Sequence, residues 1–591
     1  MSLSDLGHDY SRYPFRHRNS YVESSPPPPP SSRSALVDSS GGPLLPAASP
    51  VKNPFNDSAR ASTEFDREKV FSPFIDDRIS VPISHTDGFP MFVDEKEWDD
   101  ELHMPEPDDD EKFRPKMKDY MGRQAVISFI GLVLLILGLL CIFIVLPVVT
   151  FTGITAPSGK NSSATYPTER PWTWVNDVKY PLFTNMRTSL IDPATPSSAM
   201  TRPGLNGNTL NLVFSDEFTK PNRSFYPGDD PYWTAPNIWY GATQDLEWYD
   251  PDAVTTYNGT LQLRLDQTLN HNVQFRSGML NSWNQICFKG GALEVALSLP
   301  GPSGVPGLWP GVWTMGNLGR PGYKASTEGV WPYTYDSCDA GITPNQSSPD
   351  GISHLPGQRL SSCTCQGEDH PTPGTGRGAP EIDVIEASVD PNNFIGVVTQ
   401  SYQVAPYDIW YNPNYDFMAI PNVNTTTMNA WCGGPFQQGI SGTTLLNNDW
   451  YDGNEYQKYA FEYTPGTSNG EIAWFVGDDV SYMMSGQAVG PNGNIGSRQI
   501  SEEPMSIILN LGISNSWTWI DWARLTFPTV MRIDYVRWYQ PEGEEVVTCD
   551  PPGYETTEYI SNHPLAYNNP NLTQWNETGY SWPKNSLMHG C

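Results

Sequence analysis

After about residue 205, the chain is built from short runs in which apolar and polar positions alternate. Every second residue of Leu261–Leu265 is a leucine, and every second residue of Tyr459–Tyr463 is aromatic. Side chains two apart share one face of a β-strand, so this period predicts half-buried strands. Three further segments have the apolar character of strands: Leu293–Leu297, Ile472–Val476 and Met531–Tyr539.

The connections between these runs predict a sheet-rich domain. Ser468–Gly470 lies between two predicted strands and is typical of a hairpin turn. Glycine and proline occur throughout, and no long segment with a 3.6-residue apolar period intervenes. Many short strands in one unit favour an all-β sandwich of the jelly-roll type over residues 205–540.

One uncharged apolar segment precedes this domain. Ala125–Val149 contains no charged residue, and about 20 apolar residues are enough to cross the hydrocarbon core of a bilayer. A buried soluble helix of that composition is improbable. The segment lies too far from the N-terminus for a cleaved signal peptide. We therefore expect a transmembrane signal anchor at 125–149.

Basic residues predict the orientation of this anchor. Five of them fall just before it, whereas the first one after it is Lys160; the five are Lys112, Arg114, Lys116, Lys118 and Arg123. The positive-inside rule places the N-terminus in the cytosol. The prediction is a single-pass type II membrane protein of the secretory pathway (endoplasmic reticulum, Golgi or plasma membrane), with its large domain lumenal or extracellular.

The regions around the anchor and the domain differ in composition. Residues 1–124 are rich in Ser, Pro and acidic side chains and predict a disordered cytosolic tail. No sorting signal is defined in the tail, so cytosolic sorting partners are left open. Residues 150–204 predict a stalk. Residues 541–591 carry Cys549 and Cys591 and predict an extension that a disulfide attaches to the domain.

Cysteines and glycosylation sequons agree with a lumenal domain. Seven of the eight cysteines follow the anchor, where disulfides persist. Seven is odd, so at least one is free or pairs with another chain. Sequons that would be lumenal occur at Asn161, Asn222, Asn258, Asn345, Asn424, Asn571 and Asn576.

Charge excludes one class of partner. The chain holds 35 Lys and Arg against 66 Asp and Glu, a net charge of −31, and no basic stripe is present to neutralise phosphates. Nucleic acid is therefore excluded as a partner. The 20 Trp, 29 Tyr and 23 Phe could fill a β-rich core or form flat platforms for sugar rings.

The strongest candidate for chemistry is Glu381–Glu386. Glu381 and Asp383 are two apart and share a face of a strand, whereas Glu386 has the opposite parity. The adjacent apolar residues Val384 and Ile385 predict a β-bulge that returns Glu386 to the same face. The alternative is an exposed acidic strand without a function.

Three gathered carboxylates suit a retaining glycosidase. Such an enzyme needs an ionised nucleophile and a protonated acid flanking the scissile bond, and neighbouring like charges raise one pKa. We assign Glu381 as nucleophile and Glu386 as general acid/base, with Asp383 orienting the nucleophile. Four tryptophans are candidate sugar platforms or, alternatively, core residues: Trp309, Trp313, Trp517 and Trp519.

The order of motifs resembles glycoside hydrolase family 16. The matching segments are Val213–Phe218, Ser277–Gly278, Trp309–Trp313, Glu381–Glu386 and Asp534–Tyr539. The resemblance covers about 205–540 and implies a concanavalin-like jelly roll with a sugar-binding cleft and a bulged catalytic strand. The wider family often binds a structural calcium, but nothing here specifies its ligands. No cofactor or metal is assigned.

The chain is more similar still to fungal membrane proteins associated with β-1,6-glucan synthesis, the killer-toxin-resistance and suppressor type. The segments that carry this likeness are Trp309–Tyr323, Tyr335–Asp339, Leu355–Leu360, Cys363–His370 and Gly376–Pro380. The resemblance implies a β-glucan-active glycosidase or transglycosylase needed for cell-wall β-1,6-glucan.

The insertion at 319–380 departs from ordinary family 16 enzymes. We expect this cysteine-bearing segment beside the cleft, where it restricts subsites, binds an acceptor or recruits a partner. A non-catalytic glucan-binding scaffold or assembly factor is the alternative function.

Overall fold

The computed structural model describes residues 131–133, 136–137, 172–175, 178–181, 186–346 and 353–591. The described residues from Trp172 onward belong to one compact unit. Its strands bury the faces that the alternating pattern predicts. The three leucines of Leu261–Leu265 are fully buried, and so are the aromatic side chains of Tyr459–Tyr463. The predicted hairpin is confirmed, because the strands on either side of Ser468–Gly470 pair antiparallel.

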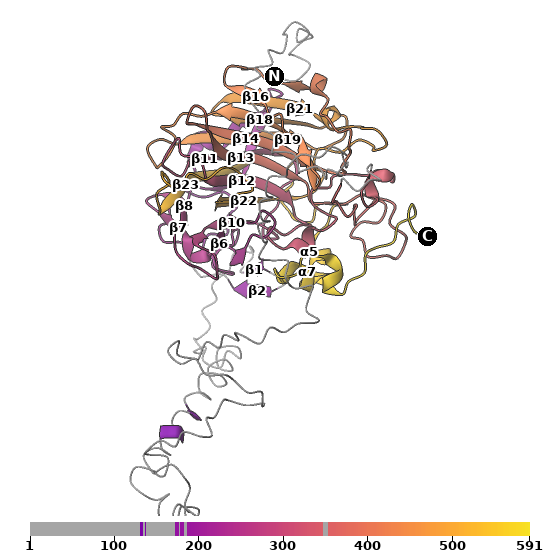
Figure 1. The fold of residues 1–591 in the computed structure, drawn as a ribbon, viewed down its shortest axis with the longest axis horizontal. Coiled ribbons are helices and arrows are strands. Elements are labelled where there is room, and N and C mark those ends of the chain that lie inside the picture. The colour runs from indigo at the N-terminus through magenta and orange to yellow at the C-terminus, as the bar shows by residue number, and fades with distance from the viewer. Residues whose placement is uncertain (1–130, 134–135, 138–171, 176–177, 182–185, 347–352) are drawn as a thin grey trace, which may run out of the picture. The chain divides into compact units, whose positions relative to one another are not determined.

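Two large antiparallel sheets form the unit. The eight-stranded sheet has the order β10-β22-β12-β13-β14-β18-β16, with β17 also paired to β18. In Figure 1 the labels of the seven strands in this order run upward, from β10 to β16 near the top. Its strands are β10 (Met279–Asn281), β22 (Met505–Gly512), β12 (Trp309–Gly316), β13 (Glu381–Asp390), β14 (Ile395–Val404), β18 (Gln437–Leu445), β16 (Thr426–Met428) and β17 (Gly433–Gly434).

The ten-stranded sheet has the order β15-β21-β20-β19-β11-β23-β4-β3, with β8 paired to β23 and β7 to β8. Its strands are β15 (Met418–Ala419), β21 (Asp479–Ser485), β20 (Glu471–Val476), β19 (Gln457–Thr464), β11 (Gly291–Ser298), β23 (Thr529–Pro541), β4 (Thr209–Asp216), β3 (Thr201–Pro203), β8 (Thr260–Leu265) and β7 (Val254–Tyr257).

The main core lies between these sheets. Val312 and Leu509 of the eight-stranded sheet belong to one buried cluster with Leu293, Phe461 and Trp538 of the ten-stranded sheet. A sheet has two faces, so the face of the eight-stranded sheet that points away from this core is not covered by the ten-stranded sheet. We call it the free face. The described part of the chain is therefore an all-β sandwich, as expected.

Smaller elements complete the described chain. A three-stranded sheet contains β5 (Ile238–Trp239), β6 (Glu247–Tyr249) and β9 (Phe275–Ser277), and β1 (Trp172–Val175) pairs with β2 (Val178–Pro181). The helices are α5 (Lys324–Thr327), α6 (Thr557–Asn562), α7 (Pro564–Asn568), η5 (Ser197–Ala199), η6 (Pro251–Ala253), η7 (Ala340–Ile342), η8 (Tyr415–Phe417), η9 (Gly486–Val489) and η10 (Trp575–Thr578).

The N-terminal boundary of the sandwich lies before residue 205. β3 pairs with β4 through Thr201–Pro203, and Arg187 forms an ion pair of 3.3 Å with the buried Asp216. The end of the expected stalk is thus part of the folded unit. The expected tail, most of the anchor segment 125–149 and Asn161 lie outside the described residues. Among those that are described, no helix has the length and apolar character needed to cross a membrane.

Disulfides attach the C-terminal extension at two places, as predicted. Cys549 pairs with Cys287 at the edge of the core, and Cys591 pairs with Cys365 of the insertion. Cys338 pairs with Cys363 within the insertion. Cys432 is free, which agrees with the odd number of cysteines after the anchor.

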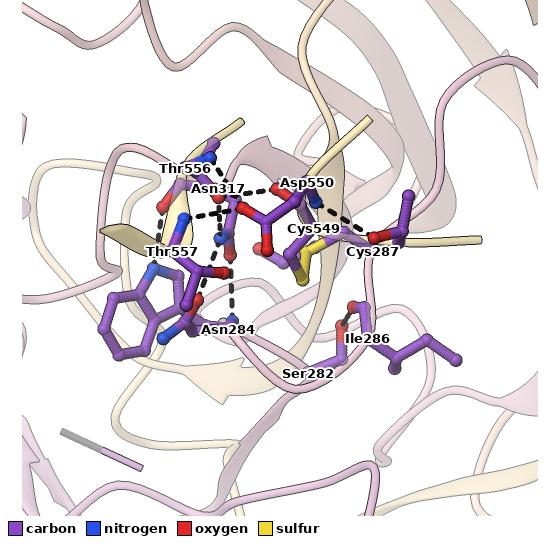
Figure 2. Close-up of a disulfide and its surroundings, with 12 residues drawn as sticks. Ser282, Asn284, Ile286, Cys287, Asn317, Cys549, Asp550, Thr556 and Thr557 are labelled. Atoms are coloured by element: carbon purple, nitrogen blue, oxygen red, sulfur yellow. Dashed lines mark hydrogen bonds between the residues drawn. A yellow bond between two sulfur atoms is a disulfide. The ribbon is translucent and has the colours of Figure 1, made fainter. Parts of the chain in front are cut away.

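A polar network surrounds the first of these disulfides. The side-chain amide of Asn317 donates to Thr556 Oγ1 at 2.8 Å and to Asn284 Oδ1 at 3.2 Å (Figure 2). Asp550 Oδ1 accepts from the backbone N–H groups of Thr556 and Thr557 at 2.9 and 2.8 Å. The start of the extension is therefore tied covalently to the segment between β10 and β11, and by a buried hydrogen bond to Asn317 in the loop after β12.

The insertion and the extension pack together over one part of the free face. Met315 and Ile508 of the eight-stranded sheet belong to a second buried cluster with Leu360 of the insertion and Tyr567 of the extension. In Figure 1, α5 of the insertion lies beside α7 of the extension. A buried ion pair of 2.8 Å between Arg377 and Glu503 fixes the end of the insertion to the loop before β22. The extension is thus a structural layer of the domain.

Candidate active site

The predicted bulge is present in β13. Pairing of β13 with both neighbours shifts register between Asp383 and Glu386. Ile382 and Val384 before the shift and Ile385 and Ala387 after it all enter the main core. The parity of the core-facing residues therefore changes at Val384–Ile385, which is the position that the sequence predicts.

The bulge brings three carboxylates to one face. Glu381, Asp383 and Glu386 pair in register with alternate residues of β12, namely Met315, Trp313 and Gly311. Directly paired residues project to the same side, and alternate residues share a face. The sandwich core occupies the other side, so the carboxylates lie on the free face of the eight-stranded sheet.

Each carboxyl group has its own hydrogen-bond donor. The indole Nε1 of Trp331 donates to Glu381 Oε2 at 2.6 Å, and that of Trp309 donates to Glu386 Oε1 at 3.1 Å. Gln403 Nε2 donates to Asp383 Oδ2 at 3.1 Å. Each of the three carboxyl groups is therefore oriented by a different side chain.

Burial and mutual repulsion keep protons on this cluster. Burial, followed by the charge of Glu386, raises the pKa of Glu381 to about 8, against hydrogen bonds from Trp331 and Asp383. Burial raises the pKa of Glu386 to about 7, against the hydrogen bond from Trp309. Burial, then the charges of Glu381 and Glu386, raise the pKa of Asp383 well above its usual range. The set shares its protons near neutral pH.

The donors, more than the order of these two pKa values, distinguish the two glutamates. Glu381 is hydrogen-bonded by Trp331 and by Asp383, whereas Glu386 is hydrogen-bonded by Trp309. Hydrogen bonds to a carboxylate favour its ionised form. Because Asp383 keeps its proton and donates it in a hydrogen bond to Glu381, Glu381 is the carboxylate of the three that is ionised. Glu386 is then the carboxyl group that exchanges a proton with a ligand.

Two of the four expected tryptophan platforms lie beside Glu386. Trp309 stacks on Trp517 with ring centroids 4.6 Å apart and planes at 6°. Trp517 Nε1 also donates to the carbonyl of Ala387 at 3.2 Å. This pair forms an aromatic wall at the Glu386 end of the site.

The other two tryptophans differ from the expectation. Trp313 is buried in the second cluster, and its Nε1 donates to Asn510 Oδ1 at 2.8 Å, so it packs as a core residue and offers no free face. Trp519 is 63% exposed, and among the described residues no hydrogen bond joins it to the carboxylates.

The six expected glycosylation sites within the described residues are all exposed.

Sequence reasoning missed Trp331 and Gln403, the donors to Glu381 and Asp383. Trp331 belongs to the insertion, which was expected beside the cleft, but no local pattern indicates that its indole reaches the nucleophile. Gln403 is paired with Glu381 across β13 and β14. Only the strand register, which a single sequence does not give, could have identified it.

A second pair of buried carboxyl groups lies behind Trp313. Asn510 Nδ2 donates to Tyr249 OH at 3.1 Å, and that hydroxyl donates to Asp245 Oδ2 at 3.2 Å. Burial raises the pKa of Asp245 to about 6, and burial followed by the charge of Asp245 raises the pKa of Glu247 well above its usual range. This network fixes the position of Trp313 from the side away from the carboxylates.

Comparison with known proteins places these observations among relatives. Residues 89–591 match the model of a family described as "Beta-glucan synthesis-associated protein SKN1/KRE6/Sbg1". The chain is 54% identical over 553 residues to the β-glucan synthesis-associated protein KRE6 of Saccharomyces cerevisiae, which covers 92% of this chain and 75% of that protein. It is 52% identical over 511 residues to the β-glucan synthesis-associated protein SKN1 of Candida albicans, which covers 85% and 68%.

Among solved structures, the catalytic domain of an endo-1,3-β-glucanase (laminarinase) from Thermotoga petrophila RKU-1 aligns with a TM-score of 0.34. It is 17% identical and covers 57% of this chain and 100% of that chain.

Proposed function

Because this chain belongs to the family of β-glucan synthesis-associated proteins that includes SKN1 and KRE6, we propose that it is a retaining β-glucan glycosidase or transglycosylase needed for fungal cell-wall β-1,6-glucan. The observation that carries the proposal is the bulge in β13, which gathers Glu381, Asp383 and Glu386 on the free face of the sheet. An acidic strand without a function has no need of such an interruption in its pairing.

The first step forms a glycosyl-enzyme. A carboxylate oxygen of Glu381 attacks the anomeric carbon, the bond from that carbon to the leaving oxygen breaks, and Glu386 donates its proton to that oxygen. Asp383 keeps its proton and hydrogen-bonds Glu381, which orients the attacking oxygen. A pKa of about 7 for Glu386 suits a group that must donate and later accept the same proton.

The second step returns the enzyme to its starting state. Glu386, now a carboxylate, takes a proton from an acceptor hydroxyl. The acceptor oxygen attacks the anomeric carbon, and the ester bond to Glu381 breaks. A sugar hydroxyl as acceptor gives transfer, and water gives hydrolysis. A membrane-anchored protein of the secretory pathway is better suited to remodelling the cell's own glucan than to digesting food.

We also propose a lumenal location for the sandwich domain and a type II anchor at 125–149. Three disulfides within the described residues support an oxidising compartment. The exposed asparagines of six sequons support the same side of the membrane. Digestion of the mature protein with an endoglycosidase should shift its mobility, and the N-terminal tail should be accessible to protease in sealed microsomes.

One contact favours a non-catalytic glucan-binding scaffold as the second candidate. The Trp331 indole, which comes from the insertion, occupies one oxygen of the proposed nucleophile. A nucleophile that remains capped could bind sugar without forming a covalent bond.

The deciding experiment incubates the purified full-length chain with defined β-1,3- and β-1,6-linked gluco-oligosaccharides. We expect transfer or hydrolysis products, and mass-spectrometric trapping of a 2-deoxy-2-fluoroglucosyl ester on Glu381. Glu381→Gln and Glu386→Gln should abolish product formation, whereas Glu544→Gln, at an exposed position, should not. Saturable binding without product, together with normal wall β-1,6-glucan in both active-site variants, would favour the scaffold.

A further inference from the structure

Two buried polar atoms beside the carboxylates lack hydrogen-bond partners. Gln403 is 6% exposed and Ser441 is 2% exposed. Within the described part of the chain, neither Gln403 Oε1 nor Ser441 Oγ has a hydrogen-bond partner. A buried polar atom left unpaired destabilises a protein by about 1–3 kcal/mol. Such atoms are completed by a bound water or by a polar group of a ligand.

The strand register places both side chains on the carboxylate face. Gln403 of β14 pairs with Glu381 on one side and Gly439 on the other, and Ser401 pairs with Asp383 and Ser441 in the same way. Directly paired residues project to one side of a sheet. Gln403 and Ser441 thus follow the carboxylates across the sheet toward β18.

Gly439 of β18 lies beneath Gln403 and Trp431. A Cβ atom at Gly439 would lie 3.1 Å from Gln403 Oε1 and 3.2 Å from Trp431 Cζ3. Both distances are shorter than ordinary van der Waals contact, so the absence of a side chain allows the unpaired amide oxygen and the indole to pack close to the backbone of β18. No positive φ requires glycine here, so close approach above the backbone is what the position provides.

Trp431 forms an aromatic wall beside Gly439. Its backbone N–H donates to Asn429 Oδ1 at 3.1 Å, and the N–H of Gly439 donates to the carbonyl of Cys432 at 3.0 Å. These bonds hold the loop against β18, while the Trp431 side chain remains 46% exposed. An aromatic face above hydrogen-bonding groups is suited to a pyranose ring, which has apolar C–H faces and equatorial hydroxyls.

The opposite side of the carboxylates is filled by protein. Met279, Ile508 and Met315, from β10, β22 and β12, are buried in the second cluster under the insertion and the extension. A glucan that reaches Glu381 must therefore extend mainly over β14 and β18.

We propose that Trp431, Gln403 and Ser441 form a binding subsite for one glucosyl unit of a β-glucan, next to the catalytic carboxylates. The pyranose stacks on Trp431, one hydroxyl donates to Gln403 Oε1, and a second exchanges a hydrogen bond with Ser441 Oγ. This inference rests on the proposed function, because it takes β-glucan as the substrate. It adds the residues that bind the sugar on the side away from the insertion.

The test measures binding of β-1,3- and β-1,6-linked glucotetraoses to full-length chain carrying Glu381→Gln, which removes turnover, by calorimetry and tryptophan fluorescence. In this background, Ser441→Ala should weaken binding of at least one tetraose about 5- to 10-fold and leave the apo protein at least as thermally stable, because the removed hydroxyl has no partner to lose. Trp431→Ala should weaken binding more than 10-fold and abolish the fluorescence change. Trp410→Ala, at a tryptophan that is 78% exposed, should bind within twofold of the background.

Unchanged affinity in both Ser441→Ala and Trp431→Ala would overturn the subsite, and the unpaired atoms would then be satisfied by water only. The outcome for catalysis is separate. If the active chain forms products with an unchanged KM in both variants, the proposed function stands and the subsite does not. If the variants lose affinity while the active chain forms no product, the subsite stands and catalysis does not.

Discussion

The indole of Trp331 donates a 2.6 Å hydrogen bond to Oε2 of Glu381, so the insertion contacts the proposed nucleophile directly. Trp331 is packed against the second cluster, which also contains residues of the C-terminal extension. The ionisation of Glu381 therefore depends on how these two appended segments pack, and not only on the sheet that carries it.

Trp331→Phe should move the acidic limb of the pH profile. The indole N–H favours the ionised form of Glu381 and lowers its pKa. Removal of that donor raises the pKa, so a higher pH is needed to ionise the nucleophile, and the acidic limb of kcat/KM shifts upward. Trp582→Phe, which alters an indole packed on the same cluster, is the matched control. A profile that is identical for Trp331→Phe and wild type would contradict an ionised nucleophile at Glu381.

Trp309→Phe should shift the alkaline limb of the pH profile of kcat/KM. Its N–H lowers the pKa of Glu386, so loss of the donor keeps Glu386 protonated to higher pH. The alkaline limb of kcat/KM, which reports the general acid in the free enzyme, should therefore shift upward. Trp517→Phe alters the partner ring of the stack, but that indole donates to a backbone carbonyl. If Trp517→Phe moves the limb as far as Trp309→Phe does, the shift arises from stacking and not from the hydrogen bond.

Asp383→Asn should reduce the dependence of stability on pH. The folded pKa of Asp383 is raised above its ordinary value, so the folded state holds a proton that the unfolded chain releases above about pH 4. The unfolded state then binds fewer protons, and stability falls as pH rises. The variant removes this group, so its thermal stability should exceed that of wild type at pH 8 and fall less steeply from pH 5.

The loss of folding stability caused by Asp383 is on the order of 1.4 kcal/mol for each unit by which folding raises its pKa. Asp390→Asn, at the far end of the same strand, is the control and should keep the wild-type slope. A wild-type protein that becomes more stable between pH 5 and pH 8, with no difference in Asp383→Asn, would show that Asp383 is ionised in the folded state.

These residues also show how much the sequence could predict. Alternation in Leu261–Leu265 was sufficient for the strand and its buried face, because a two-residue period is a local property. The bulge at Val384–Ile385 was predictable for the same reason, since two adjacent apolar residues between carboxylates interrupt the period. The fold class and the carboxylate face therefore follow from local patterns.

Features that depend on long-range packing were not predictable. Trp313 was a candidate sugar platform, but it is buried in a cluster that also contains residues of the extension, more than 200 residues away in sequence. Helices α6 and α7 of the extension span six and five residues, too few to show a helical period. The unpaired oxygen of Gln403 is apparent only once the register of β14 with β13 and β18 is known.

Cys591→Ser should loosen the layer that shapes the site. The Cys365–Cys591 bond closes a sequence separation of 226 residues, and loss of a native disulfide typically destabilises a protein by about 2–4 kcal/mol. Because this bond joins the extension to the insertion, protease should cut the extension of the variant before it cuts the sandwich. Cys432→Ser, at the free cysteine, should match wild type in thermal unfolding and in cleavage rate.

Since Trp331 packs on the cluster that the extension completes, Cys591→Ser should also shift the acidic limb of the pH profile of kcat/KM to higher pH, as Trp331→Phe does. If the extension is released and that limb stays in place, the insertion orients Trp331 without help from the C-terminus.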